Sequence, residues 1–302
     1  MVRYLLETTN HRIRCYSRGE HRQNDLANDL SHDTRLTFVL GDVRDKDSLT
    51  TAAEGCSAIF HAAALKTVGS GEANPAEFIH TNVIGTENVI AAARATRVAR
   101  TLLISSDKSC QAINLYGSTK HCAESLMAHA NRLGAASGCR FASVRGGNVW
   151  ASNGSVAVLW RAARARGERL PVYGADSTRF HVCLRPWIEF AWRAACAMRG
   201  GEIFVPPLPA WRLGDLAEAF APGAWDDLGR RPGDKEHELL VSAYEAPRTV
   251  DLGWAYAVEP SPGLAAVWGY APWAGPTLPG PYSSHTARRM TPGELRKLVE
   301  AL

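Results

Sequence analysis

The chain lacks the features that would place it in several broad classes of protein. No apolar run in its 302 residues approaches the roughly 20 residues that span a bilayer. The opening MVRYLLETTNHRIR is amphipathic and does not have the charged-then-apolar pattern of a signal segment. The net charge of +4 is spread without a basic block, so neither a membrane nor a nucleic acid is indicated as a partner. We expect a soluble globular protein.

Patterns typical of metal sites and disulfides are also absent. The seven cysteines are odd in number and never spaced as C-x-x-C, and the ten histidines show no H-E-x-x-H. Scattered cysteines of this kind are typical of reduced thiols in a cytoplasmic protein. We therefore expect no metal and a cytoplasmic location.

Strand-like and helix-like segments alternate through the first half of the chain. The periodicity of apolar residues predicts strands at 11–17, 36–40, 58–61 and 102–104, and helices at 1–9, 23–30 and 82–94. Strands that alternate with helices in this way predict an α/β fold with a doubly wound parallel sheet.

Composition changes after residue 150. The sheet is assigned to a domain at 1–150, and the Pro-, Gly- and Trp-rich remainder, 151–302, predicts a smaller substrate-binding region interleaved with the last strands of the sheet. The charge-poor segment 257–285 is interpreted as a surface loop. Thr291 has the chemistry of an N-cap and predicts a terminal helix.

The stretch from Leu102 to Ser125 carries the candidate chemistry. An apolar strand leads into Ser105-Ser106-Asp107-Lys108 and then into Tyr116-Gly117-Ser118-Thr119-Lys120 at the start of a helix. Tyr116 and Lys120 lie one turn apart on one helix face, so the Lys120 ammonium is expected to lower the pKa of the phenol from about 10. Such a phenol can exchange a proton with a substrate hydroxyl near neutral pH. Alone this spacing is a weak signal, because chance produces it often.

A series of motifs resembles the extended short-chain dehydrogenase/reductases. In chain order the motifs are HAAALK (61–66), TNVIGTENVI (81–90), SSDK (105–108), YGSTK (116–120) and VRGGNV (144–149). Within that superfamily the chain is most similar to the inverting UDP-N-acetylglucosamine 4,6-dehydratases and their polysaccharide-biosynthesis relatives. STRF (177–180) and RRPGDKEHE (230–238) extend the likeness into the second half. The resemblance implies that 1–150 is a Rossmann-like NADP-binding domain.

Two departures from the family pattern leave questions open. The family begins with a strand and a G-x-x-G-x-x-G turn that binds the cofactor pyrophosphate, whereas this chain begins at a position resembling the following helix. A start codon assigned downstream of the true one would explain the difference. The alternative is a truncated protein that binds nucleotide weakly or not at all. Gly146 stands where the family usually has Tyr, which leaves the sugar preference open.

The resemblance implies NADP as the cofactor, with NAD as the alternative. Ser17, Arg18 and Arg22 occupy the region that distinguishes the two, and basic residues there suit the 2′-phosphate of NADP. Arg18 and Arg22 could instead form a solvated surface pair. The other expected cofactor contacts are Asp42 and Val43 at the adenine, Ala62 and Ala63 at a ribose, Lys66, and Tyr116 and Lys120 at the nicotinamide ribose.

The same resemblance implies a reaction. Tyr116 takes the proton of the sugar C4 hydroxyl as hydride leaves C4, and Ser106 hydrogen-bonds the C4 oxygen. Lys108 then removes the C5 proton, and Asp107 protonates the C6 hydroxyl, which leaves as water. Hydride returns to C6, and reprotonation inverts C5. Lys108 must be neutral for this role, with a lowered pKa, and Asp107 must be protonated, with a raised one. The alternative for Asp107-Lys108 is an ion pair in a surface turn.

The expected substrate is a UDP-N-acetylhexosamine. The family positions that touch it are Lys66, Thr81, Asn82, Asn148, Val156, Arg179, Arg231 and Asp234. Arg179 and Arg231 could instead be salt-bridge partners between domains, and His237 and Glu238 are interpreted as structural.

We therefore expect a C5-inverting UDP-N-acetylglucosamine 4,6-dehydratase, a carbon–oxygen lyase that forms a homo-oligomer. The alternatives are an NDP-sugar 4- or 5-epimerase, a dehydratase for another NDP-hexose, and a non-catalytic remnant that binds nucleotide sugars.

Overall fold

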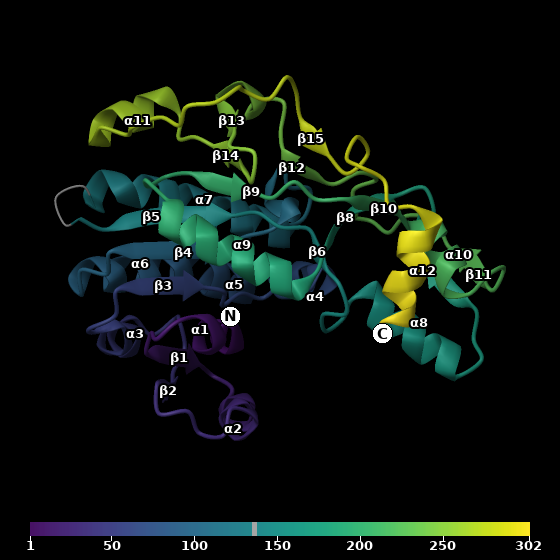
Figure 1. Ribbon diagram of the computed structural model, residues 1–302, viewed down its shortest axis with the longest axis horizontal. Coiled ribbons are helices and arrows are strands. Elements are labelled where there is room, and N and C mark those ends of the chain that lie inside the picture. Colours follow the sequence, from purple (N-terminus) through teal and green to yellow (C-terminus); the bar gives the residue numbers. More distant parts are fainter. Residues whose placement is uncertain (135–137) are drawn as a thin grey trace.

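A six-stranded sheet forms the centre of the molecule (Figure 1). The computed structural model describes residues 1–134 and 138–302. The strand order is β13-β14-β9-β5-β4-β3. The parallel strands are β3 (Ala58–His61), β4 (Arg100–Ile104), β5 (Arg140–Val144) and β9 (Ile203–Val205). The strands β14 (Tyr256–Val258) and β13 (Thr249–Asp251) add an antiparallel edge. The predicted α/β fold with a doubly wound sheet is confirmed.

Two further parallel strands form a sheet of their own. β1 (Ile13–Ser17) pairs with β2 (Leu36–Leu40) and, over the described residues, with no strand of the central sheet. The helices α1 (Val2–Thr8) and α2 (Glu20–Asp29) accompany this pair at the N-terminal end of the molecule (Figure 1). The side-chain amide of Gln23 donates to the carbonyl oxygens of Ser17 and Val39, which ties α2 to both strands. The alternation pattern predicts these strands but not their separation from the main sheet.

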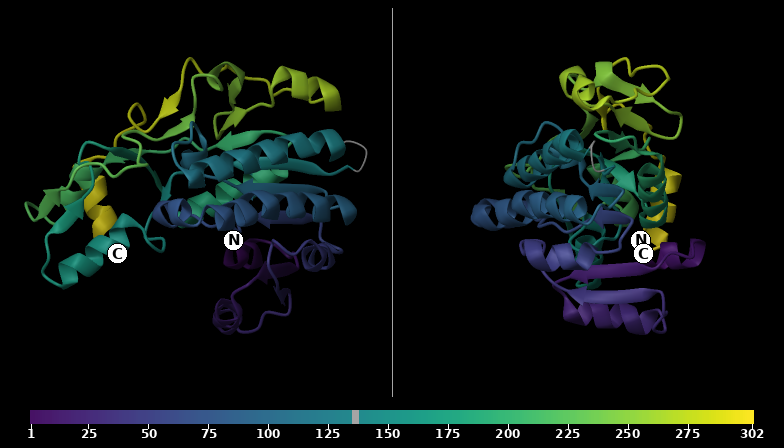
Figure 2. Two further views of the ribbon diagram at one scale, coloured as in Figure 1. Left: turned by 180° about the vertical axis from the view of Figure 1, so that it is seen from behind. Right: turned by 90° about the vertical axis from the view of Figure 1, so that its left-hand side faces the viewer.

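Helices cover both faces of the central sheet. α6 (Gly85–Ala95) and α7 (Leu115–Gly134) lie on one face, and α9 (Leu184–Ala197) lies on the other (Figure 2). Successive residues of a strand point to opposite faces, so Leu102 packs with Trp187 of α9, whereas Leu103 packs with Met127 of α7. Burial on both faces explains why these strands are apolar throughout.

The second half of the chain adds a separate group of small sheets and helices beside the sheet (Figure 1). The sheets are β6 (Asn148–Val149) with β8 (Thr178–Val182) and β10 (Ala210–Arg212), β7 (Leu170–Val172) with β11 (Trp225–Asp227), and β12 (Leu239–Val241) with β15 (Tyr282–Ser283). The helices α8 (Val156–Ala165), α10 (Leu213–Phe220) and α12 (Pro292–Glu300) enclose a core of their own that includes Trp160, Leu216 and Phe220. The division of the chain at residue 150 stays a prediction.

The remaining elements lie in the connections between the strands. They are α3 (Lys46–Ala53), α4 (Val68–Ala73), α5 (Pro75–Phe78), a π-helix (Ile79–Ile84), the 3₁₀ turns Asp107–Ser109 and Ala246–Arg248, and α11 (Pro262–Trp268). The expected terminal helix is present as α12, where Thr291 and Glu294 form a capping box. Over the described parts of the chain, no helix has the length and apolar character needed to cross a membrane.

The interpretation of 257–285 as a loop is wrong. The segment contains α11, the last residues of β14 and all of β15. Ser261 stands at the N-cap and Pro262 at the first helical position, and Gly269 ends the helix with φ 68°. These are favourable start and stop residues, which the low charge of the segment concealed.

Candidate active site

The carboxyl ends of β3, β4 and β5 position the predicted catalytic stretch. Parallel strands end at one edge of a sheet, where ligands bind in folds of this kind. Ala62 and Ala63 follow β3, Ser105 to Lys108 follow β4, and Arg145 follows β5. The amide of Asp107 donates to the carbonyl oxygen of Gly146 at 2.9 Å, which ties the turn after β4 to the chain after β5.

The Asp107–Ser109 turn is formed by serine hydroxyls. Ser106 is its N-cap, and its Oγ accepts from the amide of Lys108 at 3.3 Å. The Oγ of Ser109 donates back to the carbonyl oxygen of Ser106 at 2.6 Å. Serine side chains favour such short caps because they bond locally to the backbone. The turn therefore presents Asp107 and Lys108 in a fixed geometry.

Asp107 and Lys108 form an ion pair in which the carboxylate is buried and the lysine side chain is 22% exposed. Lys108 Nζ lies 3.1 Å from Asp107 Oδ1, which also accepts from the Oγ of Ser106 at 2.9 Å. Asp107 is 1% exposed, so the alternative of a surface-turn ion pair is wrong. Burial raises the pKa of Asp107 against the opposing charge of Lys108, which agrees with the expected protonated carboxyl.

A third charge, which the sequence did not reveal, contacts this pair. Glu238 Oε1 lies 3.3 Å from Lys108 Nζ, and the Glu238 side chain is 3% exposed. Burial by itself lowers the pKa of Lys108, but the carboxylates of Asp107 and Glu238 raise it above its ordinary value. The expected lowering is therefore wrong for the free protein. Glu238 thus contacts the predicted base, and its interpretation as structural stays a prediction.

Tyr116 and Lys120 begin α7 beside this turn. Lys120 is 3% exposed, and its Nζ donates to the carbonyl oxygen of Ile104 at 2.7 Å. Burial lowers the pKa of Lys120 to about 8. Burial raises the pKa of Tyr116, while the charge of Lys108 and the hydroxyl of Ser106 act in the opposite direction. The expected lowering of the Tyr116 pKa by Lys120 is thus corrected, and the cation that favours the phenolate is Lys108.

A buried network of ion pairs and hydrogen bonds around Arg145 is connected to the catalytic turn. The Arg145 guanidinium is 1% exposed and lies 2.7 Å from Glu124 Oε2 and 2.8 Å from Glu245 Oε1. Glu124 also accepts from the Oγ of Ser109, within the turn, at 2.7 Å. The sequence patterns considered above do not predict this network, although an arginine directly after the apolar strand at 141–144 is a visible signal.

Gly117 lies where α7 and the catalytic turn approach most closely. A Cβ at this position would collide with the carbonyl oxygen of Lys108 and would lie 3.1 Å from the Cβ of Ala112. Only glycine therefore allows the first turn of α7 to pack against the backbone that carries the predicted base.

Gly117→Ala is expected to displace Lys108 and to reduce turnover about 100-fold, because misplacement of a reacting group by about 1 Å has that effect. Overpacking should also lower the free energy of unfolding by about 1–3 kcal/mol. Gly69→Ala, in α4, is the matched control, since nothing lies within 4 Å of its Cβ position. Steady-state kinetics and urea unfolding of both variants test the expectation, which fails if Gly117→Ala turns over like Gly69→Ala.

Residues predicted to contact the cofactor lie after β1 and β2. Ser17 Oγ accepts from the amide of Gln23 at 2.9 Å. Asp42 Oδ2 lies 2.7 Å from Arg44 Nη2 and 3.5 Å from Arg18 Nη1. The hydrogen bonds from Arg44 lower the pKa of Asp42, so this carboxylate is ionised. Arg18 is half-exposed and Arg22 is exposed on α2, and their contact with a cofactor stays a prediction.

The residues after β3 and in the π-helix divide into two groups. Ala62, Ala63 and Lys66 are exposed, and Lys66 Nζ donates to the carbonyl oxygen of Asn153 at 3.2 Å. Asn82 is buried, and its amide bonds both backbone groups of Leu65 and the hydroxyl of Thr119. Asn82 thus joins the loop after β3 to α7, and its predicted contact with substrate is untested.

Three further residues predicted to contact ligands lie in other elements: Thr81 in the π-helix, Val43 after β2 and Val156 at the start of α8.

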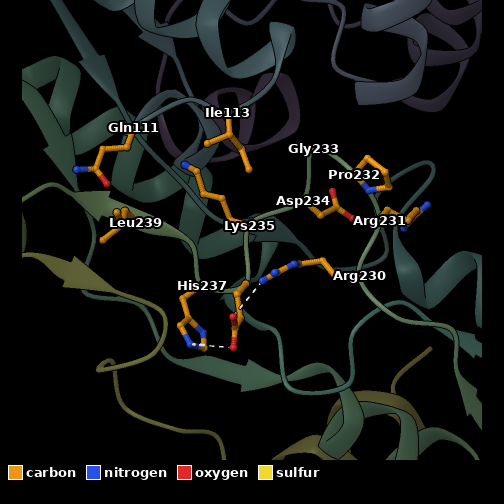
Figure 3. A pocket seen from close by; sticks show the side chains of 11 residues that line it. Gln111, Ile113, Arg230, Arg231, Pro232, Gly233, Asp234, Lys235, His237 and Leu239 are labelled. Atoms are coloured by element: carbon orange, nitrogen blue, oxygen red, sulfur yellow. Dashed lines mark hydrogen bonds and ion pairs between the residues drawn. The ribbon is translucent and has the colours of Figure 1, made fainter.

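A cavity of about 680 Å³ lies between the 230–237 segment and residues that follow the catalytic turn (Figure 3). Its lining is the 230–237 segment together with Gln111, Ile113 and Leu239. Arg231 stacks over the ring of Tyr173 at 4.1 Å and lies 3.5 Å from Asp234. Lys235 donates to the carbonyl oxygen of Cys110, which joins this segment to the turn. The loop predicted to bind the nucleotide therefore lies next to the predicted acid and base.

β6 and β8 contribute the remaining predicted residues. Arg179 of β8 lies 3.8 Å from Glu238 and donates to the carbonyl oxygens of Thr178 and Glu236. It is a salt-bridge partner in this structure, and its contact with a diphosphate is untested. Asn148 Oδ1 in β6 is buried and has no hydrogen-bond partner in the described chain. Thr81 Oγ1 and Ser105 Oγ are orphaned in the same way.

Gly146 makes room for an aromatic ring. A Cβ at Gly146 would lie 2.7 Å from the Trp187 indole. A tyrosine at this position would therefore require Trp187 to move, and the two positions are coupled in volume.

The comparisons with known proteins agree with this geometry. The polysaccharide biosynthesis protein family matches residues 1–260. The chain belongs to this family. Its relatives include the inverting UDP-N-acetylglucosamine 4,6-dehydratase of Campylobacter jejuni, 36% identical over 252 residues, which are 83% of this chain and 75% of that protein. The UDP-glucose 4-epimerase of Rickettsia typhi is 34% identical over 298 residues, 96% of this chain and 87% of that protein.

Solved structures share the fold of this family member. Pen from Bacillus thuringiensis superposes with a TM-score of 0.91 at 29% identity, covering 100% of this chain and 93% of that one. DesIV, a dTDP-glucose 4,6-dehydratase from Streptomyces venezuelae solved with NAD and TYD bound, gives 0.71 at 18% identity, covering 99% and 91%, and shares the fold.

The residues present fit a nicotinamide dinucleotide in part. The unpartnered hydroxyl of Ser105 and the Lys120 ammonium lie at the end of β4, where a ribose would need such groups. Ser17, Arg18 and Asp42 supply polar and charged groups after β1 and β2. The glycine-rich pyrophosphate turn of the family is not among the residues of this chain.

Proposed function

We propose that this family member is a UDP-N-acetylglucosamine 4,6-dehydratase that inverts C5. The observation that carries the proposal is the buried Asp107–Lys108 pair, 3.1 Å apart, on the turn that packs against Tyr116 and Lys120. A carboxyl and an amine with shared protons can serve as general acid and general base in an elimination. The chain's relatives include a sugar-nucleotide dehydratase and a sugar-nucleotide epimerase, which supports an enzyme of this kind.

In the proposed reaction each residue moves or holds a proton. Tyr116 accepts the proton of the C4 hydroxyl, aided by the positive charge of Lys108, and Ser106 hydrogen-bonds the C4 oxygen. Lys108 in its amine form takes the proton from C5. Asp107 in its acid form gives its proton to the C6 oxygen, so that the C6–O bond breaks and water leaves. Lys108 then lies where its ammonium can return a proton to C5.

A bound nicotinamide dinucleotide would supply the acceptor and donor for the hydride that leaves C4 and returns at C6. Lys120, Ser17, Arg18, Arg22, Asp42, Val43, Ala62, Ala63 and Lys66 are the proposed contacts. Arg18 and Arg22 favour NADP over NAD, because guanidinium groups suit a 2′-phosphate. Several structural neighbours were solved with NAD, so the choice between the two requires a binding measurement.

The proposed substrate contacts are Lys66, Thr81, Asn82, Asn148, Val156, Arg179, Arg231 and Asp234. The cavity beside the catalytic turn (Figure 3) supports this part of the proposal, because it combines two arginines, a lysine and an open volume of about 680 Å³. Arginine suits a diphosphate because it can form two parallel hydrogen bonds. We further propose a cytoplasmic homo-oligomer.

A 4-epimerase acting on an NDP-sugar is the second candidate. It is favoured by the Rickettsia relatives and by Gly146, whose packing against Trp187 departs from the family pattern. A 5-epimerase, or a dehydratase for another NDP-hexose, would use the same pocket. An epimerase would have no need of a buried Asp107–Lys108 pair, which is why dehydration is the first candidate.

Incubation of the purified protein with UDP-N-acetylglucosamine and NADP or NAD distinguishes the candidates. We expect a product lighter by one water, detected by mass spectrometry, with deuterium at C5 when the solvent is D₂O. An unchanged mass with a new C4 configuration would establish the epimerase instead. Absence of turnover and of NADP or NAD binding by calorimetry, with binding of UDP-N-acetylglucosamine retained, would leave only a non-catalytic remnant. UDP-glucose serves as the comparison substrate.

A further inference from the structure

Glu238 is the residue of the acid–base cluster that the proposed reaction does not use. Its side chain is 3% exposed, and its Oε1 is 3.3 Å from the ammonium of Lys108. Its second oxygen, Oε2, is buried without a hydrogen-bond partner in the part of the chain that the structure describes. A buried carboxylate without full hydrogen bonding is costly, so its position needs a reason.

Glu238 and Asp107 differ in the number of cations that hold them. Glu238 lies within 4.0 Å of three, namely Lys108 at 3.3 Å, Arg179 at 3.8 Å and Lys235 at 3.9 Å. Among the residues that the structure describes, Asp107 pairs with Lys108 alone, at 3.1 Å. If one of the two carboxyls carries a proton, the carboxyl with fewer cations carries it at the lower cost.

We propose that Glu238 is a positioning residue that keeps itself ionised and makes Asp107 the carboxyl that accepts the proton of Lys108. The transfer moves one proton from Lys108 Nζ to Asp107 Oδ1 and converts an ammonium and a carboxylate into an amine and a carboxylic acid. No other reactant is needed. The products are the base and the acid that the elimination requires, and the elimination itself regenerates the ion pair.

The surrounding charges agree with this assignment. The groups that face the cluster are Tyr116 from α7, Arg179 from β8 and Lys235 from the loop that carries Glu238. Burial raises the pKa of Glu238, but Lys108, Arg179 and Lys235 together hold it below its ordinary value. The pKa of Asp107 is raised by burial and further by the charge of Glu238. Arg179 and Lys235 therefore continue to neutralise Glu238 after Lys108 becomes an amine.

Glu238→Gln removes the charge and keeps the shape of the side chain. Loss of one negative charge favours the less protonated forms of both Asp107 and Lys108. We therefore expect both limbs of the bell-shaped kcat profile to move to lower pH by about one unit or more. At the wild-type optimum the active population should fall about tenfold, because one pKa unit changes a population by that factor. Glu238→Asp should restore the positions of the limbs.

A second measurement does not depend on turnover. Proteins carrying ¹³C-labelled aspartate carboxyls are titrated by NMR without substrate, and Asp107→Asn identifies the Asp107 signal. In Glu238→Gln this signal should titrate at lower pH than in the wild type. Glu202→Gln is the matched control, because Glu202 is 1% exposed and bonds the amides of Arg199 and Gly200, outside the cluster.

The two measurements separate this inference from the proposed function on which it rests. If the wild type dehydrates UDP-N-acetylglucosamine but Glu238→Gln moves neither the limbs nor the Asp107 titration, the role of Glu238 is refuted and the function stands. If the wild type has no such activity but the Asp107 titration moves in Glu238→Gln alone, the function is wrong and the proton arrangement stands. A lower kcat with unmoved limbs would assign Glu238 a merely structural role.

Discussion

Lys108→Ala is expected to lower the rate of dehydration by a factor of about 10² to 10⁴, the usual contribution of a general base. The rate at which the C5 hydrogen exchanges with solvent should fall as well. In D₂O, the variant should therefore incorporate deuterium at C5 more slowly. The protein should remain folded, because Asp107, whose pKa is raised by burial, can take up a proton when Lys108 is lost, and Arg179 and Lys235 still lie beside Glu238.

Matched variants make this expectation specific to Lys108. Lys46→Ala removes an exposed lysine at the start of α3 and should leave turnover unchanged. Added ethylamine should restore part of the activity of Lys108→Ala, because a small amine can enter the space left beside Asp107. Turnover of Lys108→Ala within tenfold of the wild type would remove Lys108 from the role of base, and Asp107 would then need another proton-transfer partner.

Arg145→Met should destabilise the fold more than any substitution at the surface. The variant leaves Glu124 and Glu245 buried without the guanidinium that lies 2.7 and 2.8 Å from them. Breaking a buried ion pair from one side costs about 3–5 kcal/mol, to be measured as the free energy of unfolding in urea. Arg94→Leu, at an exposed position of α6, is the control and should change stability by less than about 0.5 kcal/mol.

The pH dependence of stability gives the same network a second signature. Burial alone would raise the pKa of Glu245, but Arg145 lowers it to about 2. The pKa is thus lower in the folded state than its value of about 4.3 in an unfolded chain. The resulting stabilisation is fully present above the unfolded value and disappears as the pH falls towards the folded one. Arg145→Met should lack this acid-dependent component, and an unchanged acid limb would show that Arg145 does not carry it.

The local part of the site could be predicted from the sequence, because it lies within one continuous stretch. The raised pKa of Asp107 was expected from its role as an acid, and burial in the structure shifts the pKa in that direction. The one-turn spacing of Tyr116 and Lys120 was also readable. Their electrostatic relation was not, because the direction of the Lys120 ammonium depends on its hydrogen bond to Ile104.

The long-range part of the site depends on the tertiary fold. Glu238 contacts Lys108 because the 230–238 loop returns across the catalytic turn, and no periodicity predicts that return. The same applies to Glu124 and Glu245, which meet at Arg145 from distant elements. For the fold, the alternation of strands and helices predicted the layers. The helix at 262–268 can be predicted from Ser261 and Gly269, the residues at its two ends, but not from the average composition of the segment.

The separation of β1 and β2 from the central sheet has a thermodynamic consequence. Because no ladder of backbone hydrogen bonds joins the two sheets in the described chain, the β1–α2–β2 segment can open as a cooperative unit of lower stability than the remainder. Ser17, Arg18 and Asp42 belong to this unit, whereas Asp107 and Lys108 belong to the core. Any ligand that bridges Asp42 and Lys120 would bind only the closed unit and would stabilise it by mass action. Nucleotide affinity and the ordering of the N-terminal segment are then coupled through the same opening and closing equilibrium.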